Sequence, residues 1–235
     1  MKITTIPLIN LFISFLPVVL VLIVFVNWKL NWKGLVYASA RMLVQLLMIG
    51  YFLTFIFKQN NPIWTVLIVI VMLCISAWIS LYSVRHMRKN KIKDALLSLL
   101  VGALPVLCLV TIVVIPHSPW YEPSFLIPLA GMVFSNAMNT IGIAAERFEN
   151  EIEQKDLVSA KRTALGACLI PQINSFFAVG LVSLPGMMTG QILSGISPLI
   201  AVRYQIVVMT MVMGAGGLSA AFFLSRSAKL SKLAH

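Results

Sequence analysis

The chain has 235 residues, of which 60% are hydrophobic and only 11% are charged, and its mean hydropathy is +0.95. Soluble domains carry about 25% charged residues, so this composition excludes an ordinary soluble protein and indicates an integral membrane protein. The formal net charge of +11 does not indicate nucleic-acid binding, because the basic residues lie in short segments between apolar runs.

The expected elements are membrane-spanning helices, since a helix needs about 20 apolar residues to cross a hydrocarbon core of about 30 Å. The predicted fold is all-α and polytopic, with about seven transmembrane helices in a single domain over residues 1–235. The first run is expected to be a helix, kinked near Pro17, and not a cleaved signal peptide. In chain order the runs are 6–26, 35–57, 63–84, 95–115, 125–145, 169–193 and 202–224.

Lysines and arginines are distributed unequally between the two sets of connecting segments. Fourteen fall in one set, whereas the opposite set holds only Lys2, Lys58 and Arg203. Cytoplasmic loops carry the excess of basic residues. This predicts a multi-pass protein of the cell (plasma or inner) membrane, with its N-terminus outside and its C-terminus in the cytoplasm.

The second run contains a charged residue, Arg41, with Gln45 four residues later on the same helix face. An arginine at membrane depth costs about 2.5–3.5 kcal/mol on the insertion scale, so it is usually paired or faces water. Arg41 is expected either to form a polar pair with Gln45 or to extend its side chain to the cytoplasmic surface.

The fifth and sixth runs are dotted with polar residues. In the fifth run, GMVFSNAMNTIG, the small and polar side chains suit close helix packing, or alternatively they line a polar path. The sixth run is predicted to break at Leu184-Pro185-Gly186, and broken helices often form substrate sites in transporters. The methionines after the break are soft enough for metal ions but are also common gap-fillers, so no metal ligand is assigned. The predicted substrate path is Asn136, Asn139, Asn174, Pro185, Met187, Met188 and Gln191.

The longest hydrophilic segment, ERFENEIEQKDLVSAKR, covers residues 146–162 within a predicted cytoplasmic loop at about 146–168. It is either a solvated helix between two spans or a docking surface for a cytoplasmic partner. The residues predicted to dock a partner are Glu146, Arg147, Glu151, Lys155, Lys161 and Arg162.

Catalytic motifs are absent from the sequence: there is no GxxxxGK[ST], no HExxH and no GxSxG. The three cysteines, Cys74, Cys108 and Cys168, are far apart and are expected to be small buried thiols. A proton- or sodium-driven transporter would need a carboxylate at membrane depth, and the acidic residues avoid the middle of the runs. An enzyme is therefore not expected, and a transporter is favoured.

The stretch GLVSLPGMMTGQILSGISPLIAVRYQIVVM (180–209) resembles the signature of the FetB-type family of ABC transporter permeases. Further matches are RMLVQLLMIGYFLTFIF (41–57), WYEPSFLIPLAGMVFSNAMNTIGIA (120–144) and LIPQINS (169–175). The resemblance implies a permease paired with a separate P-loop ATPase subunit, in an assembly of two permeases and two ATPases. ATP and magnesium would then be bound by the partner, and this chain would hold no cofactor.

The family includes iron-export permeases and plant aluminium-tolerance proteins, so the resemblance implies export of iron or another metal ion. Three alternatives stay open: an ABC permease for another small solute such as a nucleotide sugar, a secondary transporter, and a membrane scaffold that transports nothing.

Overall fold

The computed structural model describes residues 7–57, 61–84, 88–154 and 156–234, with side chains described as far as Lys229. Contacts within the chain divide it into two compact units, Met1–Gln59 and Asn60–His235. Each unit is helical. That residues 1–235 form a single transmembrane permease domain stays a prediction.

The first unit begins with two short helices that together make one span. α1 (Leu8–Ile13) and α2 (Leu16–Asn27) are separated by a turn, and Pro17 sits in the first turn of α2, where its missing N–H costs nothing. α3 (Trp32–Ile56) follows, capped by Asn31, whose side chain accepts a hydrogen bond from the Gly34 amide at 3.1 Å. The predicted kink near Pro17 is confirmed.

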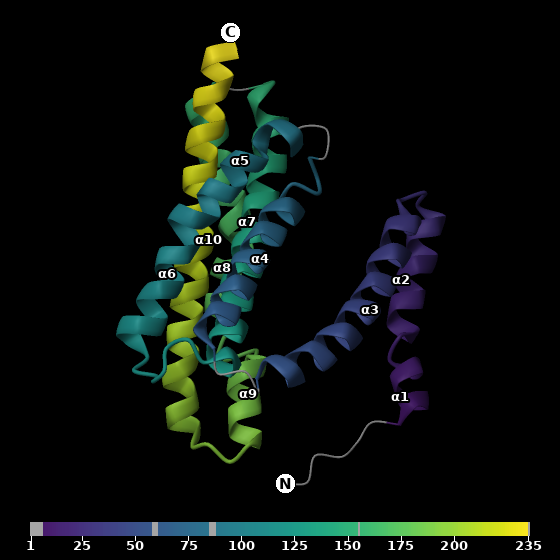
Figure 1. Cartoon of the computed structure of the whole chain (residues 1–235). Helices are drawn as coiled ribbons and strands as arrows, with labels where there is room; N and C mark the ends of the chain where they lie inside the picture. The colour runs from purple at the N-terminus through teal and green to yellow at the C-terminus, as the bar shows by residue number, and fades with distance from the viewer. Residues whose placement is uncertain (1–6, 58–60, 85–87, 155, 235) are drawn as a thin grey trace. The chain divides into compact units, whose positions relative to one another are not determined.

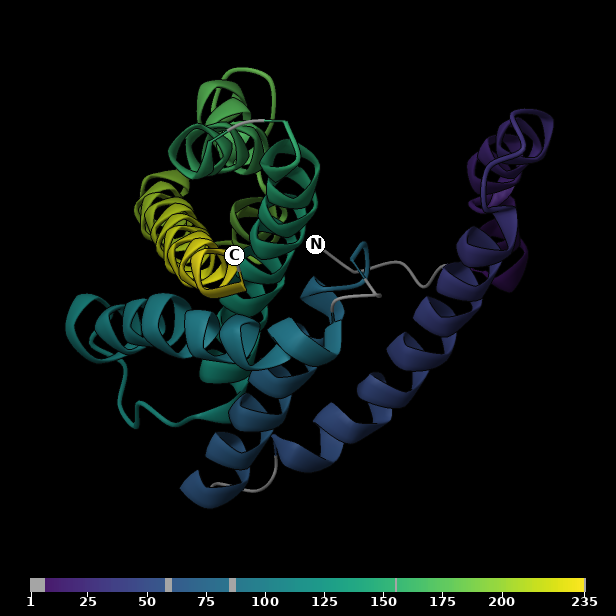
Figure 2. The same ribbon diagram turned by 90° about the horizontal axis from the view of Figure 1, so that it is seen from above.

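The second unit is a bundle in which α7 (Pro123–Ile152) contacts α4 (Pro62–Ser80), α8 (Leu157–Ala178) and α10 (Pro198–Ala234) (Figures 1 and 2). α7 holds much of the buried core, including Phe134, Ile141 and Phe148. α10 runs along the whole length of the unit in Figure 1. α7 therefore packs against three other helices of this unit.

The span between α4 and α7 is irregular. It consists of α5 (Arg88–Ser98), a wide π-helical turn (Leu99–Ala103), α6 (Leu104–Cys108) and a second π-helical turn (Leu109–Val114). Pro105 cannot donate to the carbonyl four residues earlier, and π-helical turns are a common local response to such a lost bond. Gly102 brings this span close to α10, because a Cβ there would lie 2.5 Å from the backbone nitrogen of Ser219.

The predicted break in the sixth span is confirmed, but it is longer than Leu184-Pro185-Gly186. α8 ends at Ala178 and α9 (Gly186–Leu193) begins directly after Pro185, with a turn between them. In Figure 1, α9 lies beside the first turns of α10. The break starts early because the backbone at Gly180 adopts φ +84°, which glycine tolerates and a helix does not.

Six helical segments of the described residues are long and apolar enough to cross a membrane, and α8 is not among them. The chain is thus a polytopic all-α membrane protein, and the expected seven spans are an approximate count that includes the broken α8–α9 element. α8 starts at Leu157 instead of 169, and α7 continues to Ile152. Most of the segment predicted as the loop 146–168 is therefore formed by the ends of two helices.

Candidate functional site

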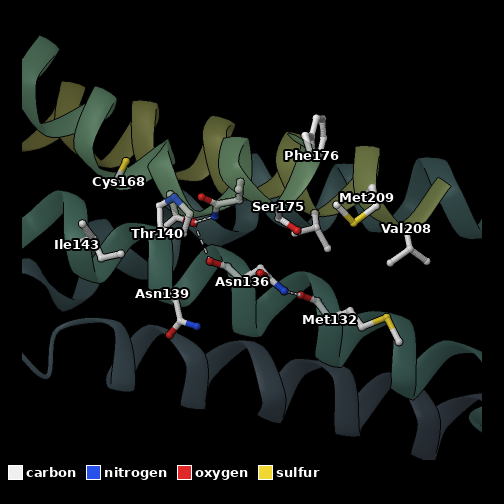
Figure 3. Close-up of a pocket in the computed structure, with 13 residues that line it drawn as sticks. Met132, Asn136, Asn139, Thr140, Ile143, Cys168, Ser175, Phe176, Val208 and Met209 are labelled. Carbon is white, nitrogen blue, oxygen red and sulfur yellow. Dashed lines mark hydrogen bonds between the residues drawn. The ribbon is translucent and has the colours of Figure 1, made fainter. Parts of the chain in front are cut away.

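A cavity of about 390 Å³, called the central cavity here, lies between α7, α8 and α10 (Figure 3). Its lining is mostly apolar but includes three sulfur-containing side chains. None of the described residues that line it is Lys, Arg, His, Asp or Glu. Its polar and sulfur-bearing lining residues are Met132, Asn136, Asn139, Thr140, Cys168, Gln172, Ser175 and Met209.

A chain of hydrogen bonds runs along α7 and crosses to α8. The Asn136 side-chain amide donates to the Met132 carbonyl at 2.9 Å, and the Thr140 hydroxyl donates to the Asn136 carbonyl at 2.8 Å (Figure 3). The Gln172 amide nitrogen then donates to the Thr140 hydroxyl oxygen at 2.5 Å. Met132, Asn136 and Thr140 are spaced four residues apart on α7, so the helix repeat places them in one row.

Gln172 keeps an unused acceptor at this cavity. The residue is only 8% exposed, and its side-chain oxygen is buried and makes no hydrogen bond. An unsatisfied buried acceptor costs about 1–3 kcal/mol. Gln172 thus has an acceptor without a hydrogen-bond partner beside the central cavity.

Gly216 on α10 permits this arrangement. A Cβ at that position would lie 2.9 Å from the Thr140 hydroxyl oxygen and 3.2 Å from the Gln172 amide nitrogen. Three helices therefore meet at the polar pair. Pro171, which also lines the cavity, has no N–H to donate to the Ala167 carbonyl.

A second cavity of about 360 Å³, called the outer cavity, adjoins the break between α8 and α9. It is lined by Val179 and Gly180 of the break, by Met188 of α9 and by Gln205 of α10. Gln205 is 5% exposed, and its side-chain oxygen is also buried without a hydrogen bond. Gln172 and Gln205 thus each line a cavity, and each has a side-chain oxygen that is buried without a hydrogen bond.

The structure divides the residues predicted for the substrate path. Asn136 and Asn139 line the central cavity, and Met188 lines the outer one. Met187 packs against the main hydrophobic core, Pro185 precedes α9, and Gln191 has a buried oxygen without a hydrogen bond. Asn174 is exposed on α8 and lines neither cavity. Their role in a path stays a prediction.

Gln172 and Gln205 were not selected from the sequence. Both lie inside predicted spans, as does Gln45, which was predicted to pair with Arg41. An uncharged amide is unfavourable in lipid at all three positions. Gln45 itself lies beside Arg41: with its amide oxygen turned to the guanidinium, it accepts from Nε at 3.1 Å and from Nη2 at 3.3 Å. The structure thus brings the predicted polar pair together on α3.

Ion pairs tie α5 to its neighbours at the end of the unit opposite α9. Arg226 on α10 donates to the Asp94 carboxylate at 2.5 Å, and Asp94 is only 2% exposed. Lys91 pairs with Glu149 of α7 and also lies 5.8 Å from the centre of the Phe148 ring. α5 is therefore fixed to both α7 and α10 by charged contacts.

The residues predicted to dock a partner lie at this same end. Glu146, Arg147 and Arg162 are exposed, and Lys161 is half-buried. Glu151 is buried and pairs with Arg147 at 2.6 Å, so it is not displayed to a partner. Lys155 lies outside the described residues.

A polar cluster precedes α7 at the opposite end. His117 Nε2 lies 2.6 Å from a Glu122 oxygen, Ser124 donates to the other oxygen at 2.5 Å, and the His117 ring stacks on Phe125. Hydrogen bonding from Ser124, and then from His117, holds the pKa of Glu122 below its ordinary value. Across the described parts of the chain, no three His, Cys, Asp or Glu residues group closely enough to hold a metal ion.

Comparison with known proteins extends over most of the chain. The model of the uncharacterised protein family UPF0014 matches residues 8–230. A UPF0014 membrane protein of Synechocystis is 37% identical over 207 residues, covering 78% of this chain and 80% of its own length. The Arabidopsis thaliana protein ALUMINUM SENSITIVE 3 is 34% identical, covering 86% and 79%.

The Escherichia coli protein named "Probable iron export permease protein FetB" is 31% identical, covering 80% of this chain and 77% of its own. These matches confirm the resemblance seen in the sequence. No solved structure matches the chain.

Proposed function

The chain belongs to the UPF0014 family of membrane proteins, and from this membership we propose that it is the permease subunit of an ATP-driven exporter of iron or another metal cation. The observation that carries the proposal is the central cavity, which is lined by Gln172 with its unpaired side-chain oxygen and by no Lys, Arg or His among the described residues. The iron export named for the Escherichia coli relative is consistent with that lining.

The chemistry of the cavity favours a cation over an anion. Its polar lining offers amide and hydroxyl oxygens, and Met132 and Met209 add thioether sulfur. Oxygen and soft sulfur atoms are donors to metal cations, whereas a phosphate-bearing solute would require Arg, Lys or clustered N–H groups. A nucleotide sugar is therefore disfavoured at this cavity.

The energy source would be a partner chain. The sequence has no P-loop, so ATP and magnesium would be held by a separate ATPase, in a two-plus-two assembly. The exposed charged residues Glu146, Arg147 and Arg162 at the ends of α7 and α8 would meet that partner on the cytoplasmic side. The proposed orientation in the inner membrane, with the N-terminus outside, follows from the basic residues.

The test is purification of the tagged chain from native membranes, followed by reconstitution with what accompanies it. A stoichiometric P-loop ATPase and ATP-dependent movement of Fe²⁺ across the bilayer are expected, with no movement when ATP is replaced by a non-hydrolysable analogue. Recovery without an ATPase, under conditions that keep a related transporter intact, would favour a scaffold.

A further inference from the structure

We propose that the cargo crosses through the chain itself, along three adjoining cavities that follow α7, α8 and α10. Glu146 stands at the inner mouth of this route, and Gln172 and Gln205 are its successive binding positions. The inference rests on the proposed transport function, but its location in the fold is argued from geometry alone.

The three cavities share lining residues. An inner cavity of about 470 Å³ extends from the end of α4 to Glu146, and it shares Asn139, Ile143 and Pro171 with the central cavity. The central and outer cavities share Phe176 and Met209. In Figure 3, Ile143 and Cys168 lie at one end of the central cavity, and Phe176 and Met209 lie at the other. The cavities therefore follow one another in a line.

The line is as long as a membrane is thick. Thr140 and Gly216 are at one level, and Met132 and Val208, each eight residues earlier, both line the central cavity, so α7 and α10 run parallel. At about 1.5 Å per residue, Val202 of the outer cavity lies about 21 Å from that level and Glu146 about 9 Å from it on the other side. The total of about 30 Å equals the hydrocarbon thickness of a typical bilayer.

Each cavity is lined by a residue that carries an acceptor oxygen. Glu146, which is exposed, lines the inner cavity. Gln172 and Gln205, whose side-chain oxygens are buried without a hydrogen bond, line the central and outer cavities. None of the described residues that line the three cavities is Lys, Arg or His. Glu146 is the one residue among them with a carboxylate. A buried acceptor without a partner is unfavourable unless a ligand or water reaches it.

Phe176 and Met209 form the partition between the central and outer cavities, because both cavities include them in their walls. The next residue, Phe177, is exposed and lines neither cavity. These neighbouring phenylalanines provide a matched pair, since truncation removes the same ring from the partition in one variant and from the outer surface of the helix in the other.

The first test maps the route with water-soluble thiol reagents, in a background where Cys74, Cys108 and Cys168 are replaced by alanine. Thr210→Cys, in the outer cavity, is expected to react from outside about tenfold faster than Leu218→Cys on the exposed apolar face of α10, because the thiolate forms only where water reaches it. Ser175→Cys, in the central cavity, is expected to react slowly from outside. Adding Phe176→Ala should raise its rate about tenfold by opening the partition, and Phe177→Ala should not.

The second test concerns Glu146. In inverted vesicles, a cationic thiosulfonate is expected to modify Asn139→Cys faster than an anionic one of similar size, and Glu146→Gln should abolish the difference. Glu153→Gln, at an exposed acid beyond the end of α7, should leave it unchanged.

Equal effects of Phe176→Ala and Phe177→Ala, or equal labelling of Thr210→Cys and Leu218→Cys, would overturn the route. If the cationic reagent still reacts faster than the anionic one in Glu146→Gln, Glu146 does not lie at the mouth of the route. Neither assay uses ATP, an ATPase or iron, so these outcomes are independent of the proposed function. Iron transport with failed labelling would keep the function and refute this route.

Discussion

Gln172 on α8 donates one hydrogen bond to Thr140 on α7 and leaves its own carbonyl oxygen buried without a partner. The donor half of the side chain joins two helices that line the central cavity. Structure and proposed function thus depend on different atoms of the same residue.

Gln172→Leu removes the acceptor, while Thr140 keeps its bond to the Asn136 carbonyl. We expect ATP-dependent metal transport to fall by about tenfold, equivalent to about 1.4 kcal/mol of lost interaction with the cargo. The unfolding midpoint in detergent should also fall, because the hydrogen bond to Thr140 is lost with the amide, so transport is compared per folded protein. Gln154→Leu, on an exposed turn, is the control, and equal transport by both variants would contradict the role of Gln172.

Gly216→Ala should destabilise the second unit by about 1–3 kcal/mol, since the new methyl group would press on Thr140 and Gln172. Gly217→Ala is the matched control. Its Cβ would meet only Leu169, at an ordinary 3.8 Å. Thermal unfolding of the two variants should differ clearly, and similar midpoints would show that the helices can separate at this level without cost.

Arg226→Met leaves the Asp94 carboxylate buried without its partner, so we expect a loss of about 1–3 kcal/mol in unfolding free energy. The estimate is at the low end of buried pairs because the Arg226 side chain is 42% exposed. The double variant with Asp94→Asn should recover part of the loss, since no charge remains buried. Lys229→Met, exposed near the end of α10, should have little effect.

Glu122 predicts a dependence of stability on pH. Because its pKa is lower when folded, its contribution is fully present above the ordinary carboxyl value of 4.5 and is lost as the pH falls through the folded value. The unfolding midpoint should therefore decrease below that pH in the parent protein and decrease less in Glu122→Gln. Ser124→Ala should move the decrease to higher pH, because it removes the largest cause of the lowered pKa.

The sequence was sufficient for the class of fold, since runs of about 20 apolar residues have few alternatives in a protein. It also located the break at Pro185, because proline cannot continue a helix. It did not reveal that the break begins at Val179, which depends on the left-handed backbone of Gly180. Helix-forming residues likewise extended α7 and α8 into the segment expected to be a loop.

The candidate site was harder to predict, because it depends on which helices meet. Asn136 and Asn139 were visible as polar residues in an apolar run. Gln172 and Gln205 were not predicted as site residues. The role of a single glutamine in a span depends on a neighbour such as Thr140 or on a cavity beside it, and the sequence shows neither. Asn174 illustrates the converse, since its helix face points it away from the central cavity.

The break between α8 and α9 has an electrostatic consequence. Val179, the residue after α8, lines the outer cavity, so the carboxyl end of that helix is directed toward this space. Helix dipoles place a partial negative charge of about half an electron at such an end, worth about 0.3–1 kcal/mol to a nearby cation. This attraction comes from the backbone and carries no proton. The contribution of the α8 end to a cation near Gln205 would therefore be the same in acidic and neutral surroundings. It is opposed by the amino end of α9, whose first-turn residue Met188 lines the same cavity.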